Sequence, residues 1–166
     1  MKKLSLFFIL AILGFTGCDD SPSEEERINS FARRNDLDII TTESGLAYNI
    51  TTPGVGSFAE NGDTVRVDYV GFTMNGEVFD TSLEVVAVNV GLFNPARTYE
   101  PIEFVVGAGR VIQGWDEAMT LLNTGSAATI LIPSNLAYGV TGVPPIIAPN
   151  SPIGFTVTLV EKRDGP

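Results

Sequence analysis

The sequence contains no histidine and a single cysteine, Cys18. Without histidine, the chain cannot build a Ser–His or Cys–His catalytic pair, a histidine-ligated metal site or an imidazole proton relay. One cysteine excludes an internal disulfide and a cysteine-rich zinc site. The polar groups that remain for chemistry are carboxylates, hydroxyls, tyrosine phenols and backbone amides.

Basic residues are also scarce, because 10 lysines and arginines stand against 20 aspartates and glutamates, for a formal charge of −10 at pH 7. No basic stripe is available to displace the counterions of a phosphate backbone, so the composition argues against nucleic-acid binding. The same charge opposes adsorption to anionic lipid headgroups. Any membrane attachment would therefore have to be covalent or hydrophobic. The 166 residues, 44% of them hydrophobic, suffice for one domain plus extensions.

Residues 1–17 have the pattern of a signal peptide. Two lysines precede an almost wholly apolar run, Leu4–Phe15, which is too short to span a bilayer as a stable helix. Thr16-Gly17-Cys18 resembles a bacterial lipobox, in which the cysteine is lipidated and becomes the mature N-terminus, although Phe15 stands where such boxes usually carry leucine. We expect a lipid-anchored protein of the cell envelope, at the outer membrane or periplasmic face or exposed at the surface. An ordinary cleaved signal peptide is the alternative.

Residues 18–44 form an N-terminal extension in this interpretation. The stretch Asp19–Glu26 (DDSPSEEE) predicts an extended, solvated tether, because its charges repel one another. Glu25–Asn35 predicts a short helix with acidic residues at its start and an apolar face made of Ile28, Phe31 and Ala32. We interpret this helix as a spacer or as a lid on the edge of the domain.

From Gly45 onward the pattern is that of β-strands. In Thr64–Gly71, Val65, Val67 and Tyr69 alternate with polar residues and give the strand an inward and an outward face. Asn75-Gly76 predicts a hairpin turn after this strand. The other predicted strands are Leu46–Thr51, Glu77–Asp80, Ala127–Ile132 and Phe155–Val160.

One helix is predicted among these strands, in and after the stretch Phe104–Met119. Its apolar stripe consists of Ile112, Trp115, Met119 and Leu122, which recur at helical spacing. The sequence therefore predicts an α+β fold, in which an antiparallel sheet of about five strands half wraps around one short helix. On spacing alone, Trp115 is core filler, and so are Tyr69 and Phe155 at alternating strand positions.

Two segments fit no regular element. Leu83–Pro101 is a long excursion that contains a β-like run, VVAVNV. Ala137–Pro152 holds four prolines, a density that forbids a central strand. This loop is apolar and stiff and carries Tyr138, Ile146 and Ile147, so it is a candidate wall for a pocket.

Five stretches together resemble an FKBP-type peptidyl-prolyl cis/trans isomerase. They are VDYVG (67–71), VFDTS (78–82), IEFVVGAGRVIQGWDEAM (102–119), IPSNLAYGVTGVPPIIAPNS (132–151) and FTVTLV (155–160). Their motifs Y-x-G, F-D, V-I-x-G-W and A-Y-G-x-x-G occur in the order of the family. The resemblance implies an isomerase domain at 45–166, with an FKBP-like fold and an insert at about 83–101 that would lie beside the pocket.

The resemblance also implies the residues of the pocket. Four would take part in catalysis: Ile112 through its backbone N–H and Tyr138 through its phenol would bind the substrate carbonyl, Trp115 would form the floor, and Asp80 would set a polar corner. Tyr69 is expected to hold Asp80. The implied substrate-binding walls are Tyr69, Phe79, Ile102, Val111, Ile146 and Phe155. Ile102 stands where an aromatic residue is usual, which makes one wall smaller.

The implied activity is isomerisation of X–Pro bonds in exported, unfolded polypeptides, with no metal or cofactor and with a macrolide as a possible inhibitor. Two alternatives remain from the residues: a non-catalytic FKBP-like chaperone or adaptor, and a surface-binding lipoprotein. The long insert and Ile102 favour the chaperone. The intact F-D, V-I-x-G-W and A-Y-G motifs favour catalysis.

Overall fold

The computed structural model of the chain describes residues 21–166. The targeting segment expected at 1–17 and Cys18 lie outside these residues. The helices are α1 (Glu24–Arg34), α2 (Glu84–Val90) and α3 (Gln113–Met119), with a short 3-10 turn, η1, at Ser134–Leu136. The strands are β1 (Ile40–Thr41), β2 (Ala47–Thr52), β3 (Val55–Phe58), β4 (Thr64–Thr73), β5 (Val78–Thr81), β6 (Ile102–Val105), β7 (Asn123–Thr124), β8 (Ala127–Ile132) and β9 (Ile153–Arg163).

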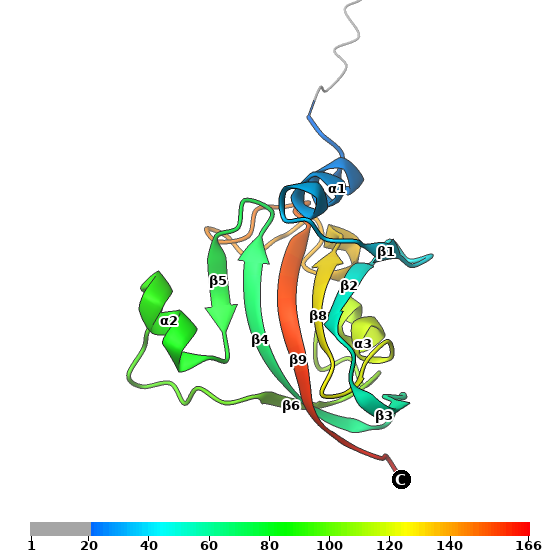
Figure 1. Cartoon of the computed structure of the whole chain (residues 1–166). Coiled ribbons are helices and arrows are strands. Elements are labelled where there is room, and N and C mark those ends of the chain that lie inside the picture. Colours follow the sequence, from blue (N-terminus) through cyan, green and yellow to red (C-terminus); the bar gives the residue numbers. More distant parts are fainter. Residues whose placement is uncertain (1–20) are drawn as a thin grey trace, which may run out of the picture.

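Seven of the described strands form one large antiparallel sheet around β4 and β9, and β3 and β7 pair in a separate two-stranded sheet (Figure 1). The order of the large sheet is β1-β2-β8-β9-β4-β5, and β6 also pairs with β4. The pairing of β4 with β9 is the longest, from Thr64 opposite Arg163 to Thr73 opposite Ile153. On its other edge, β4 pairs first with β6 and then with β5. The insert between β5 and β6 therefore leaves and rejoins the same edge of one strand.

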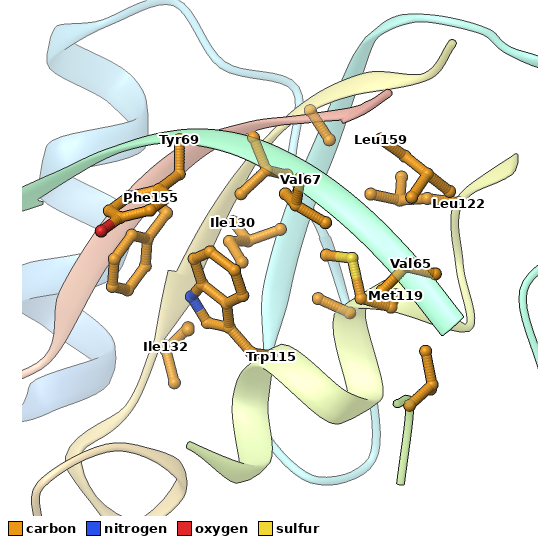
Figure 2. Packing of buried hydrophobic residues seen from close by; sticks show 14 of the residues in the cluster. Val65, Val67, Tyr69, Trp115, Met119, Leu122, Ile130, Ile132, Phe155 and Leu159 are labelled. Atoms are coloured by element: carbon orange, nitrogen blue, oxygen red, sulfur yellow. The ribbon is translucent and has the colours of Figure 1, made fainter. Parts of the chain in front are cut away.

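The main core lies between the sheet and α3. Val65 and Val67 are completely buried and Tyr69 nearly so, which confirms the alternation predicted for β4. Trp115 and Met119 rise from α3 toward this strand (Figure 2). Gly114 lets α3 approach β8 closely, because a side-chain carbon there would lie 2.4 Å from Ile132 Cγ2. The predicted α+β fold with an antiparallel sheet on a short helix is confirmed.

The opposite face of the sheet is covered at one end by α1. Alternation along β8 separates the two cores, because Ile130 and Ile132 belong to the α3 side and Leu131 to the α1 side. Phe31 of α1 stacks on Phe72 of β4 with ring centroids 5.1 Å apart. The apolar face predicted for this helix is buried, so α1 is part of the packed domain. Of the two alternatives for this helix, a spacer or a lid on the edge of the domain, its packing on the sheet fits the second.

The insert differs from its prediction. The β-like run VVAVNV lies in a helix, α2, which packs beside β5 on the left of Figure 1. Valine is enriched in strands, but this preference spans only about 1 kcal/mol and depends on context. Here α2 begins at an acidic residue and ends at Gly91, which has a left-handed φ of 76°. These helix boundaries, together with the burial of Ala87, outweigh the strand preference of the valines.

The five predicted strands are all present, β8 with the predicted ends and the other four with shifted ends. Within residues 21–166 the short strands β1, β3, β6 and β7 join them. The predicted apolar stripe is also spread more widely than one helix, because Ile112 is the N-cap of α3 and Leu122 follows its end.

Candidate functional site

A cavity of about 160 Å³ opens between α3 and the concave face of the sheet. Residues from β4, β5, β6, α3, the 137–152 loop and β9 line it, so it is built by nearly the whole domain. The lining residues are Tyr69, Phe79, Asp80, Ile102, Val111, Ile112, Trp115, Tyr138 and Phe155. Nine of the ten residues implied by the sequence resemblance are thus brought together.

Trp115 forms the floor of this cavity and is also a core residue, only 4% exposed. Its ring meets Tyr69 and Phe155 edge-on, with centroids 5.3 and 5.2 Å away (Figure 2). Such perpendicular contacts are a favourable arrangement of aromatic rings. Its indole N–H is buried and has no acceptor among the described residues. A buried donor without a partner is costly, and such donors occur in native proteins mainly where function requires them.

The turn before α3 is fixed from within the helix. Asp116 accepts hydrogen bonds from the backbone N–H groups of Gly107 (2.8 Å) and Gly109 (3.2 Å). This carboxylate holds the turn that leads to Val111 and Ile112. The backbone N–H of Ile112 has no acceptor within the part of the chain that the structure describes, so it is free to bind a ligand at the cavity.

Two phenylalanines form the side walls. The rings of Phe79 and Phe155 meet edge-on, with centroids 5.7 Å apart. Both pass directly over Gly71, where a side-chain carbon would lie 2.7 Å from Phe155 Cε1 and 2.8 Å from Phe79 Cε2. The glycine of the Y-x-G motif is therefore required by the close approach of these rings.

The polar corner of the cavity is a network of three side chains. The Tyr69 hydroxyl donates to Asp80 Oδ2 at 2.7 Å, as expected. Arg97 donates to Asp80 Oδ1 at 2.5 Å and to the Tyr69 oxygen at 3.1 Å. Burial, together with the neighbouring Asp80 carboxylate, raises the pKa of Tyr69 to about 12. At neutral pH the phenol is protonated and acts as the donor of this corner.

Arg97 belongs to the insert and was not among the predicted site residues. Its guanidinium also lies over the ring of Tyr99, 5.3 Å from the centroid, and Tyr99 stacks on Phe93. The expected position of the insert beside the pocket is confirmed by these contacts. Sequence reasoning missed Arg97 because its partners lie 17 and 28 residues away. The signal in the sequence that could have pointed to Arg97 is that it is a single basic residue at the end of a run without charged residues.

Tyr138 is carried by the 137–152 loop, and its side chain lines the cavity with 37% of the residue exposed. Its hydroxyl makes no hydrogen bond with any described residue. Burial raises the pKa of this phenol, and the charge of Asp80 adds to the effect. The loop thus presents a protonated, unoccupied donor to the cavity.

Ile146 is the one predicted wall residue that does not line the cavity. It is 56% exposed, while the next residue, Ile147, is buried in the main core. The reason is a tight turn in which the Val143 N–H and the Ile147 carbonyl pair at 2.8 Å. This turn directs Ile147 inward and leaves Ile146 outside.

Within residues 21–166, no group of three or more His, Cys, Asp or Glu side chains is placed to hold a metal ion. The same residues contain no helix that is both long and apolar enough to cross a membrane.

A sequence model of the FKBP-type peptidyl-prolyl cis-trans isomerase family matches residues 56–160. FK506-binding protein 1 of Rhizopus delemar is 37% identical over 118 residues, which cover 70% of this chain and 97% of that protein. The probable FKBP-type peptidyl-prolyl cis-trans isomerase FkpA of Neisseria meningitidis serogroup B is 37% identical over 144 residues, covering 86% of this chain and 47% of the relative.

Among solved structures, FkpA from Escherichia coli superimposes with a TM-score of 0.66 and 30% sequence identity, covering 87% of this chain and 61% of that one. The chain therefore spans nearly all of the fungal relative but only about half the length of the Neisseria one.

Proposed function

The chain belongs to the FKBP-type peptidyl-prolyl cis-trans isomerase family, and on this basis we propose that it accelerates the rotation of X–Pro peptide bonds. The observation that supports the proposal most strongly is the cavity itself. It combines an aromatic floor and walls with two free donors, the Tyr138 hydroxyl and the Ile112 N–H.

The chemistry of this reaction suits such a cavity. Rotation about a peptide bond crosses a barrier of about 18–20 kcal/mol, and uncatalysed X–Pro bonds take tens to hundreds of seconds. The twisted state has lost amide resonance and is less charge-separated than either planar form. A dry, apolar site therefore disfavours the planar states relative to the twisted one. No nucleophile or metal is needed, because no covalent bond is broken.

The residues divide this work between them. The rings of Phe79, Trp115 and Phe155 would enclose the prolyl ring. The Tyr138 hydroxyl and the Ile112 N–H would hold the carbonyl, so that rotation occurs about a fixed end and binding favours the twisted state. Asp80 has no proton to move in this reaction. It would set the polar edge of the cavity through its bonds with Tyr69 and Arg97.

The test is a protease-coupled isomerisation assay on short X–Pro peptides. We expect activity above background in the wild-type chain, with kcat/KM reduced about tenfold or more in Trp115→Leu and about five- to tenfold in Tyr138→Phe, as for the loss of one hydrogen bond worth about 1 kcal/mol. Tyr48→Phe is the matched control, because Tyr48 packs on the core without lining the cavity. Equal activity in all four proteins would contradict the assignment of the cavity. A macrolide that binds the cavity should also inhibit the wild-type chain.

The proposed substrates are proline-containing, unfolded or exported polypeptides, and the proposed location is the cell envelope. The support is the signal-like pattern at 1–17 followed by Cys18. Lipidation at Cys18 would add several acyl chains, and more than one chain is what stable anchoring requires. Cys18→Ala should move the protein from the membrane fraction to the soluble one. Continued sedimentation with membranes in high salt would contradict a lipid anchor.

A second candidate function is binding of unfolded chains without turnover. It is favoured by a set of large apolar side chains that the insert leaves exposed: Val85, Val88, Val90, Leu92 and Phe93. Exposed apolar groups of this kind often mark interaction sites. The Trp115→Leu variant separates the two functions. If it still suppresses aggregation of an unfolded protein as well as wild type does, binding does not depend on the cavity.

A further inference from the structure

Helix α1 makes polar contacts with the 137–152 loop in addition to its apolar packing on the sheet. Glu24 and Arg27 lie one helical turn apart, on the side of α1 that meets this loop at the top of Figure 1. Glu24 accepts from the Ser134 N–H and from the Ser134 hydroxyl, both at 2.6 Å. Arg27 donates to the carbonyl of Asn150 at 2.6 Å. One helix thus holds η1, the turn that leads into the loop, and Asn150 near the end of the loop.

Ser134 and Asn150 are also both hydrogen-bonded to one residue inside the loop, Gly139. The Gly139 N–H donates to the Ser134 carbonyl at 2.7 Å, and the Asn150 N–H donates to the Gly139 carbonyl at 2.9 Å. A closed circuit of hydrogen bonds therefore runs from Glu24 through Ser134, Gly139 and Asn150 back to Arg27. Gly139 directly follows Tyr138 in the chain, so the circuit fixes the backbone next to the phenol.

From this circuit we propose that Glu24 and Arg27 are positioning residues, which hold the Tyr138 phenol over the cavity through the backbone of its loop. The inference rests on the function proposed above. Since the Tyr138 hydroxyl has no hydrogen bond of its own among the described residues, no such bond fixes it directly, and its position depends on the loop backbone that carries it. All three anchoring bonds involve a charged side chain, and such bonds are stronger and shorter than neutral ones.

Asn150 adds a second reason. It has a left-handed φ of 52°, which is uncommon for a residue other than glycine, although asparagine tolerates it better than most. Its N–H and its carbonyl are both used, the first inside the loop and the second by Arg27. Loss of the Arg27 bond would leave this conformation held from one side only, and the loop could relax.

The test compares two arginines of α1 in the full-length chain. Arg27→Met removes the bond to the loop. Arg34→Met is the matched control, because Arg34 donates a similar bond, 2.9 Å, to the carbonyl of Met74 in the β4–β5 hairpin. We expect kcat/KM for a prolyl peptide to fall in Arg27→Met by no more than the roughly five- to tenfold expected for Tyr138→Phe, because a misplaced phenol can lose no more than an absent hydroxyl, and to stay unchanged in Arg34→Met. Arg27→Lys should recover most of the loss, since the ammonium group can still reach a carbonyl.

A double-mutant cycle with Tyr138→Phe tests the route of the effect. If Arg27 acts through the phenol, Arg27→Met should reduce kcat/KM no further once the hydroxyl is gone. Equal further losses in both backgrounds would overturn the proposal, because Arg27 would then act elsewhere. Unchanged kcat/KM in Arg27→Met would overturn it as well.

Amide hydrogen exchange gives a readout that does not need activity. Protection of the Gly139 and Asn150 N–H groups should fall in Arg27→Met and be retained in Arg34→Met. Unchanged protection in Arg27→Met would overturn the proposal that α1 holds the loop in place. If the wild-type chain had no isomerase activity, the proposed function would fail, and the exchange data would still decide whether α1 holds the loop.

Discussion

Two long connections flank the cavity, and each brings one polar side chain to it. The insert at 83–101 delivers Arg97, which ends in a closed network with Asp80 and Tyr69. The 137–152 loop delivers Tyr138, whose hydroxyl has no partner among the described residues. The side chain from the insert is thus already hydrogen-bonded to residues of the site, whereas the side chain from the loop leaves its hydroxyl free to donate to a ligand.

The two connections also differ in how they are held. The insert is organised by itself, through α2 and through the stacking of Phe93 on Tyr99. It leaves much apolar surface exposed. The loop is held by close backbone contacts and from behind by α1. The difference implies that changes in the insert should be tolerated better than changes in the loop.

A matched pair of glycines gives the largest expected contrast. Gly142 in the loop has a φ of 62°, and a side-chain carbon there would lie 2.4 Å from the carbonyl oxygen of Ile147. Gly91 in the insert has a φ of 76° and nothing within 4 Å. We expect Gly142→Ala to lower the free energy of unfolding by about 2–4 kcal/mol, from strain plus a backbone clash, and Gly91→Ala by about 1 kcal/mol, from strain alone. Urea unfolding measures both, and equal losses would contradict the comparison.

Removal of Arg97 should have a smaller effect, on activity more than on stability. The ion pair with Asp80 leaves both side chains 39% exposed, and such pairs contribute about 0–1 kcal/mol. We expect Arg97→Met to change the melting temperature little and to lower kcat/KM about threefold, because Asp80 and Tyr69 lose their alignment. Arg66→Met is the control, since Arg66 pairs with Glu161 and does not line the cavity. A fall in activity for both variants would point to general charge effects.

The smallest expected effect is on the ionisation of the Tyr69 phenol at high pH. The pKa of Tyr69 is raised to about 12, above the ordinary value of 10.0 for the unfolded chain. The protonated phenol is therefore favoured by folding, so its contribution to stability is complete below about pH 10 and is lost as the pH rises toward 12. In an absorbance titration of tyrosinate, Tyr69→Phe should remove the last transition. Asp80→Asn should lower the pKa of Tyr69. A last transition that persists in Tyr69→Phe would mean that another tyrosine is the more deeply protected one.

The sequence predicted those parts of the fold whose side chains alternate or repeat in one local pattern. β4 could be placed because the residues of one face lie in a core, β8 because its short apolar run lies in a core on both faces, and α3 because Trp115 and Met119 recur at helical spacing. The short strand β6 carries no such pattern over its four residues. α2 was predicted as β-like because valines were weighed without the helix boundaries at Glu84 and Gly91.

The site was predictable from its motifs, except where position depends on distant partners. Ile146 and Ile147 are alike in sequence, and only the turn at Val143 decides which of them is buried. Arg97 and the two α1 residues that hold the loop act across 17 to 123 residues of chain. Spacing along the sequence contains no information on such pairs.

The long pairing of β4 with β9 has a consequence for how the domain forms. These neighbours in the middle of the sheet are about a hundred residues apart, as Thr64 and Arg163 illustrate. β8 also cannot be joined to β4 in the sheet before β9 is present, because β9 lies between β8 and β4. A chain emerging from a ribosome or a translocation pore can therefore not close its sheet until its last strand has appeared. Contacts of this range make folding slow and place it after synthesis, with the apolar faces of β4 and β8 uncovered until then.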